Sequence, residues 1–268
     1  MCMYDWKKKG AGLFAMALLL FGVFAEFYWY ENRDFGNSTE CVSVETQTQA
    51  TEENQKVAEE KQKKIAYLSF DDGPSQNTER VLDVLKIYNI KATFFLIGEN
   101  ITPKREKLLE RMKEEGHVIG IHTYSHDAKK MYTSAKDFEE DFLKAEKSIS
   151  PYVDEDIKLC RFPWGSANKY LKKIEGSVIP WLQERGYAYF DWNVSGEDSV
   201  GCPTCSSIYK NVKKDVFRYD NPVILLHDSG TCDKTVQVLP DVIALIKSEG
   251  YQFDTLDHMA SPYQYPRN

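Results

Sequence analysis

The chain lacks the excess of lysine and arginine that binding to nucleic acid requires. It has 34 Lys and Arg against 41 Asp and Glu, which gives a net charge of -7. Proteins bind phosphate backbones through clustered basic side chains, and the short basic run at 61–64 directly follows Glu59 and Glu60. The chain also has no glycine-rich nucleotide-binding fingerprint and no internal repeat. We therefore expect no nucleic-acid partner and no nucleotide cofactor.

A second Cys-x-x-Cys pair is also missing, although the chain has six cysteines. Cys202 and Cys205 have the spacing of a redox or zinc pair, but a zinc ribbon would need another pair at matching spacing. In an exported protein, the last four cysteines could form disulfides. Unmodified thiols and a redox or metal role stay open for Cys160, Cys202, Cys205 and Cys232.

The N-terminal part lacks the composition of a folded domain. Residues 10–30 are apolar except for Glu26, and about 20 such residues suffice to cross a bilayer. Lysines at 7–9 precede this run and acidic residues follow it, which favours a cytoplasmic N-terminus and an exported C-terminal part. We expect a single membrane anchor. A cleaved signal peptide is the alternative, with cleavage near Ala25.

The segment after the anchor contains neither proline nor glycine from 37 to 62, and it is rich in Thr, Glu, Gln and Ser. Such a composition cannot bury a core and predicts a flexible stalk. The expected organisation is a cytoplasmic N-terminus at 1–9, an anchor at 10–30, a linker at 31–63 and a folded domain at 64–268.

Within the domain, short apolar runs alternate with longer amphipathic ones, which predicts a parallel α/β sheet. The expected strands are 65–70, 92–97, 118–121, 158–162, 187–192, 222–227 and 251–254. The expected helices are 77–88, 104–115, 134–148, 168–185, 206–216 and 234–249. Six or seven such units without a nucleotide-binding fingerprint favour a (β/α) barrel closed on itself over an open doubly wound sheet.

Two pairs of metal-ligating residues follow predicted strands. Asp71 and Asp72 precede a Gly-Pro turn, where the chain can bend so that both carboxylates face one pocket. His122 and His126 lie four residues apart after another apolar run. One carboxylate and two imidazoles make a three-ligand hydrolytic metal site with open positions, and this leaves the second carboxylate as a base.

Two further groups lie at the ends of predicted strands, at the face of a barrel where catalytic groups gather. Arg161 opens the run Arg-Phe-Pro-Trp-Gly and could pair with a carboxylate. His227 ends a buried strand, where it could donate a proton.

Taken in order, these segments resemble the motifs of the polysaccharide deacetylase family, also called the NodB-homology family of carbohydrate esterases. Residues 69–74 match its Thr-Phe-Asp-Asp-Gly-Pro motif with Ser69 in place of Thr. Residues 122–126 match His-Ser/Thr-x-x-His, and 161–165 match Arg-x-Pro-Tyr with Trp164 in place of Tyr. Leu225, Leu226 and His227 match Leu-x-His. The resemblance implies a distorted (β/α) barrel and covers residues 65 to about 255.

The resemblance also implies a role for each matching residue. Asp72, His122 and His126 would bind a divalent metal, with Zn2+ expected and Co2+ or another ion as alternatives. Asp71 would be the base, Arg161 its partner and His227 the proton donor. The backbone N–H of Trp164 would bind the oxyanion, and Pro163 and Leu225 would line the substrate site.

The fourth motif departs from the family's Asp-x-x-Asp-Trp, since Ser195 and Ser199 stand at the first Asp and at the Trp. Asp198 keeps the carboxylate that would orient His227, with Asp191 as its rival. The missing aromatic residue at position 199 should open one wall of the sugar groove.

The expected function is removal of N-acetyl groups from a cell-wall polysaccharide, with N-acetylglucosamine of peptidoglycan as the leading substrate. An O-acetyl esterase acting on another polysaccharide and an inactive wall-binding module are the alternatives. The anchor at 10–30 would hold the domain on the outer side of the cell membrane, where this substrate lies.

Overall fold

The computed structural model describes residues 64–153 and 158–267. The expected cytoplasmic segment, anchor and linker lie outside these residues. In the part that is described, no helix is long and apolar enough to span a membrane.

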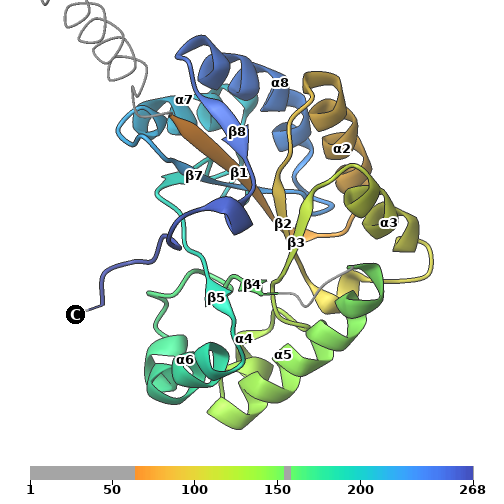
Figure 1. Ribbon diagram of the computed structural model, residues 1–268, viewed down its shortest axis with the longest axis vertical. Coiled ribbons are helices and arrows are strands. Elements are labelled where there is room, and N and C mark those ends of the chain that lie inside the picture. The colour runs from red at the N-terminus through yellow and green to blue at the C-terminus, as the bar shows by residue number, and fades with distance from the viewer. Residues whose placement is uncertain (1–63, 154–157, 268) are drawn as a thin grey trace, which may run out of the picture. The chain divides into compact units, whose positions relative to one another are not determined.

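A curled sheet of eight parallel strands forms the centre of the domain (Figure 1). Its strands run in the order β5-β4-β3-β2-β1-β7-β6, and β8 pairs with the first residues of β1. Their bounds are β1 Ile65–Gly73, β2 Thr93–Leu96, β3 Val118–Ile121, β4 Leu159–Cys160, β5 Ala188–Tyr189, β6 Val194–Ser195, β7 Val223–His227 and β8 Gln252–Asp254. The parallel α/β class expected from the sequence is confirmed.

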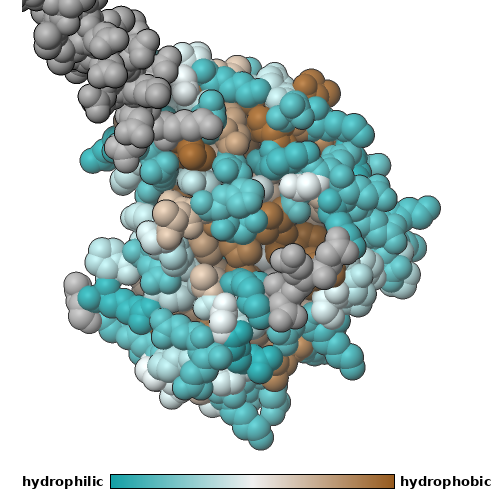
Figure 2. All heavy atoms as spheres, in the orientation of Figure 1, coloured by the Kyte–Doolittle hydropathy of each residue, from teal (hydrophilic) through white to brown (hydrophobic). Residues whose placement is uncertain are grey.

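The helices lie around the sheet and bury their apolar faces against it (Figure 1). Their bounds are α2 Gln76–Tyr88, α3 Glu106–Glu114, α4 Ala128–Met131, α5 Ala135–Ile149, α6 Glu175–Glu184, α7 Cys205–Val216 and α8 Asp233–Ser248. Short 3-10 turns are η1 Gly98–Asn100, η2 Ser150–Tyr152, η3 Leu171–Lys173 and η4 Leu256–His258. Polar residues cover most of the face that Figure 2 shows.

The closed barrel expected from the sequence is wrong. Among the described strands, β5 and β6 end the sheet and no ladder joins them. Only residues 190–193 separate these two strands, whereas two parallel neighbours need a crossover of a dozen residues or more. The sheet therefore curls into an incomplete barrel, which agrees with the distorted (β/α) barrel that the resemblance implies.

A C-terminal segment lies at this opening. The backbone N–H of Asp191 donates to the carbonyl of Tyr263, and the N–H of Tyr265 donates to the Asp191 carboxylate. Gln264 donates from its side chain to the carbonyl of Tyr189. Residues 263–265 thus form hydrogen bonds with Tyr189 of β5 and with Asp191 in the connection from β5 to β6.

One expected helix differs in detail, and two short elements were not expected. The helix expected at 168–185 is divided into η3 and α6, and the turn between them at Ile174 leaves the helical conformation. Strand β6 and helix α4 were not expected. Each has only two to four residues, which is too short to produce a readable periodicity.

Candidate active site

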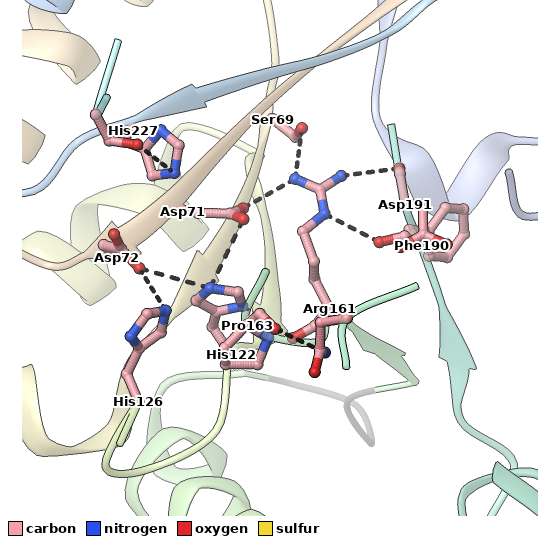
Figure 3. Close-up of polar contacts among 12 residues, drawn as sticks. Ser69, Asp71, Asp72, His122, His126, Arg161, Pro163, Phe190, Asp191 and His227 are labelled. Carbon is pink, nitrogen blue, oxygen red and sulfur yellow. Dashed lines mark hydrogen bonds and ion pairs between the residues drawn. The ribbon is translucent and has the colours of Figure 1, made fainter. Parts of the chain in front are cut away.

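The two adjacent carboxylates at the end of β1 both lie near Nε2 of His122 because the strand is irregular there. Neighbouring residues of a regular strand point to opposite faces. Between Asp71 and Gly73 the register with β2 shifts, and Asp72 has a φ of 73°. A bulge of this kind redirects a side chain at the end of a strand. Figure 3 shows both carboxylates on the side of His122.

His122 and His126 meet the carboxylate of Asp72. Nε2 of His122 lies 3.5 Å from Asp72 Oδ1, and Nε2 of His126 lies 3.4 Å from the same oxygen. One ligand atom from each of the three residues lies within 4.8 Å of the others. Asp72 Oδ1 is buried without a hydrogen-bond partner among the described residues. An orphaned carboxylate oxygen facing two imidazole nitrogens fits a divalent cation.

The protonation of His122 suits a metal ligand. Its Nδ1–H donates to the carbonyl of Arg161 over 2.8 Å, which leaves the lone pair of Nε2 facing Asp72. Burial, and then the charge of His126, lowers the pKa of His122 to about 3, so the ring is neutral. Histidine nitrogens with a carboxylate oxygen are the donors that catalytic zinc sites use, with the second nitrogen bonded to the protein.

Arg161 is fully buried and ties the base to the surrounding strands. Its Nη1 donates to Asp71 Oδ1 and to Ser69 Oγ, each over 2.8 Å. The other guanidinium nitrogens donate to the carbonyls of Phe190 and Asp191, as Figure 3 shows. Burial raises the pKa of Asp71 above the usual carboxyl range, and the charge of Arg161 opposes this rise. Asp71 is therefore a fixed carboxylate with raised basicity.

His227 ends β7 directly opposite Asp71 in the strand register. Its Nδ1 lies 2.8 Å from Asp198 Oδ1, and its backbone N–H donates to Asp198 Oδ2. Thr235 donates to the same carboxylate. Burial lowers the pKa of His227, but the hydrogen bond and charge of Asp198, with the charges of Asp71 and Asp72, raise it to about 9. The ring is thus protonated near neutral pH.

Asp191, the rival partner for His227, anchors a loop instead. Its carboxylate accepts hydrogen bonds from the backbone N–H and hydroxyl of Ser166 and from the N–H of Tyr265. In the described structure no contact joins Asp191 to His227, whereas Asp198 contacts it twice.

The remaining expected site residues lie in the loop after β4 and on β7. Trp164 has a φ of 64°, and no described group accepts a hydrogen bond from its backbone N–H. Its ring contacts that of His126, with 4.9 Å between centroids. The carbonyl of Pro163 is bonded to Tyr132 and Asn168. Leu225 is buried in β7, on the same face of the strand as His227.

Known proteins with similar sequences show which family has this arrangement of residues. The family profile described as "Polysaccharide deacetylase" matches residues 58–178. A peptidoglycan N-acetylglucosamine deacetylase of Bacillus cereus is 32% identical over 203 residues, which cover 73% of this chain and 88% of that protein. The chain belongs to the polysaccharide deacetylase family. The family and the deacetylase activity expected from the motifs are thereby confirmed.

Two other relatives of this polysaccharide deacetylase extend the comparison. A bifunctional xylanase/deacetylase of Pseudobutyrivibrio xylanivorans is 34% identical over 197 residues, and the chain spans only 30% of that longer protein. The crystal structure of the catalytic domain of a peptidoglycan N-acetylglucosamine deacetylase from Eubacterium rectale aligns with a TM-score of 0.70 at 32% identity. The alignment covers 76% of this chain and 93% of that domain.

Several residues of the deacetylase site were not found from the sequence. Ser69 holds Arg161, and Thr235 holds Asp198. Asp228 is fully buried against the turn at Gly73, and its carboxylate accepts from Thr78. Ser69 stands two positions before Asp71, so strand alternation alone could have placed it on the same face. Nothing local in the sequence marks the other contacts, which join residues far apart in the chain.

The cysteines supply no further metal centre. All four described cysteines are free thiols, and Cys160 and Cys232 are buried. Among the described residues, Asp72, His122 and His126 form the one group of three or more such side chains that could hold a metal.

Proposed function

We propose that this chain is a metal-dependent deacetylase that removes N-acetyl groups from N-acetylglucosamine of peptidoglycan. The observation that carries the proposal is that three units lie together at the carboxyl end of β1. They are the Asp72–His122–His126 donor set, the buried Asp71–Arg161 pair and the Asp198–His227 pair. Relatives named as peptidoglycan N-acetylglucosamine deacetylases support the choice of substrate.

Asp72, His122 and His126 would hold the divalent metal, for which Zn2+ is the expected ion. When bound there, the metal acts as a Lewis acid on the amide carbonyl and makes water easier to deprotonate. Asp71 lies beside this donor set, with its Oδ2 3.7 Å from His122 Nε2. Its raised pKa suits a general base that accepts the proton of the attacking water.

Attack of water on the acetyl carbonyl places negative charge on the carbonyl oxygen. The backbone N–H of Trp164 would donate a hydrogen bond to that oxygen, and a donor aimed in advance at a developing charge lowers the barrier. His227, protonated and oriented by Asp198, would donate its proton to the departing sugar nitrogen. The products are acetate and a glucosamine unit.

Peptidoglycan lies outside the cell membrane, so the domain would act there. The apolar run at 10–30 with lysines before it suits a membrane anchor with the catalytic domain outside, or a signal peptide cleaved near Ala25. Fractionation of cells that carry an epitope between residues 1 and 9 distinguishes the two, because cleavage removes the epitope from the mature protein.

Acetate release from peptidoglycan and from N-acetylglucosamine oligomers tests the proposal. The purified full chain is assayed with Zn2+, with a chelator, and as the Asp71→Asn variant. Release that requires metal and falls at least 100-fold in the variant supports it. Binding of Zn2+ and glycan without release would make the protein a wall-binding module.

An ester-cleaving activity is the second candidate, because one relative combines a xylanase with a deacetylase. The same residues would also promote the attack of water on an O-acetyl ester. Comparing kcat/KM for acetylated xylan and for peptidoglycan separates the two functions, and a higher value for xylan would replace the leading proposal.

A further inference from the structure

Two aromatic side chains beside the metal donor set are exposed to solvent. Trp164 is 49% exposed and Tyr170 is 37% exposed, although most of the large apolar residues of the described domain are buried. Their ring centroids lie 5.9 Å apart. Together they form a surface, here called the aromatic platform, that no described part of the chain covers.

The aromatic platform continues directly from the candidate active site. The ring of His126 lies 4.9 Å from that of Trp164, whose ring in turn lies 5.9 Å from that of Tyr170. A glycan whose acetyl group reaches Asp72 and His126 can therefore place a neighbouring sugar against Trp164 and Tyr170.

Buried groups hold the platform in place. The ring of Tyr170 lies parallel to the buried ring of Tyr132, with an interplanar angle of 1°. Asn168 joins both ends of the loop: its Nδ2 donates to the carbonyls of Pro163 and Gly165, and its Oδ1 accepts from the N–H groups of Tyr170 and Leu171. A surface fixed before the ligand arrives loses little conformational entropy on binding.

The chemistry of the platform fits a sugar ring. Aromatic rings present a flat apolar face, and the C–H face of a pyranose is a flat apolar partner for it. Lys169 places its ammonium 5.1 Å from the centre of the Tyr170 ring, from an exposed side chain that can move. That ammonium can donate hydrogen bonds to the hydroxyl groups of a sugar that lies on Tyr170.

We propose that Trp164 and Tyr170 bind the sugar ring next to the one that is deacetylated, so that Tyr170 sets the preference for glycan oligomers over a single sugar. This inference rests on the proposed function, because it assigns a subsite to the same substrate. The occupant is the adjacent sugar unit of the glycan substrate. We infer this because the rings of His126, Trp164 and Tyr170 form a continuous row of contacts that starts at the metal donor set.

The test is the dependence of KM on chain length. Wild-type full chain and Tyr170→Ala are compared on single N-acetylglucosamine and on its oligomers of two to five units. Tyr170→Ala should raise KM for the oligomers about 3- to 10-fold, as loss of one aromatic stacking contact does, with kcat nearly unchanged and the single sugar, which has no neighbouring unit, little affected. Tyr170→Phe should restore the wild-type KM, because the ring and not the hydroxyl carries the contact.

Lys172→Ala is the matched control, since Lys172 is exposed in the same short turn and contacts neither ring of the platform in the described structure. Its KM values should equal those of the wild type. Equal KM values for Tyr170→Ala and wild type at every length would overturn the inference. So would an equal rise at every length, because that would place Tyr170 at the reacting sugar.

A binding measurement separates this inference from the proposed function. Calorimetric titration of the Asp71→Asn protein with the N-acetylglucosamine pentamer needs no turnover. Weaker binding after Tyr170→Ala is added supports the aromatic platform, even if the wild type releases no acetate from any substrate. Unchanged binding refutes it, even if the wild type is an active deacetylase.

Discussion

Replacing Asp198 by Asn should move the basic limb of the pH–activity profile. His227 must be protonated to donate to the leaving nitrogen, so activity is present below its pKa and is lost as the pH rises through it. Asp198 is the main group that raises this pKa to about 9 against the effect of burial. Without its charge, we expect a pKa near the ordinary value of about 6.5.

The size of the effect follows from these two values. At pH 8 about nine-tenths of His227 is protonated with a pKa of about 9, whereas about 3% is protonated with a pKa near 6.5. Activity at pH 8 should therefore fall about 30-fold, while the loss at pH 6 should be much smaller. The assay is kcat/KM from pH 5 to pH 10, with the pKa of His227 followed by NMR in the metal-free protein.

Thr235→Val is the control for this experiment. It removes a hydrogen bond to Asp198 Oδ2 but keeps the carboxylate and its contact with Nδ1 of His227. The basic limb should then stay close to that of the wild type. If Asp198→Asn leaves the basic limb in place, the carboxylate does not set the protonation of His227 and the assignment of the proton donor fails.

The same pair links stability to pH. The pKa of His227 is higher in the folded protein than its ordinary value of 6.5. This contribution to folding, about 3 kcal/mol, is complete below pH 6.5 and is lost as the pH rises toward 9. Chemical denaturation of the metal-free protein at pH 6 and pH 9 measures the difference.

Three other changes test the site. Arg161→Met leaves the buried carboxylate of the base without its cation, so we expect about 3–5 kcal/mol less stability in urea unfolding, and a wild-type midpoint would contradict this. Zn2+ at 100 times its Kd should stabilise the wild type by about 2.7 kcal/mol and raise its melting temperature. Asp72→Ala should abolish this rise, because it removes one of the three metal ligands. Gly73→Ala places a Cβ 2.5–2.9 Å from the buried carboxyl group of Asp228 and should cost about 1–3 kcal/mol, whereas Gly230→Ala, whose nearest neighbour is 3.6 Å away, should be nearly neutral in the same melting assay.

The sequence predicted the parts of the fold that have a strong local pattern. Continuous apolar runs predicted four of the strands, namely β1, β2, β3 and β7. Clear apolar faces predicted three of the helices, namely α2, α5 and α8. Since the carboxyl ends of parallel strands meet at one edge, the order of these elements brought Asp71, Asp72, His122, Arg161 and His227 together.

Contacts between distant segments could not be predicted in this way. The role of Asp191 depends on Tyr265, which lies 74 residues later, and no periodic pattern connects the two. The sheet stays open because residues 190–193 are too few to connect parallel neighbours, and the sequence-based expectation of a long strand at 187–192 hid that short connection. The β-bulge at Asp72 could not be predicted either, because the Gly-Pro sequence indicates a turn but not the positive φ of Asp72.

The contact between residues 263–265 and Asp191 has a consequence for biosynthesis. Asp191 holds the loop that carries Trp164, through Ser166, and the backbone of Asp191 accepts from Arg161. Residues 263–265 are among the last described residues of the domain to be synthesised, and a single domain folds as one unit. A chain that ends before them already carries every residue of the site, but it lacks the hydrogen bonds of this segment to Tyr189 and Asp191, so the Asp191 carboxylate gains its last donor only when the domain is complete.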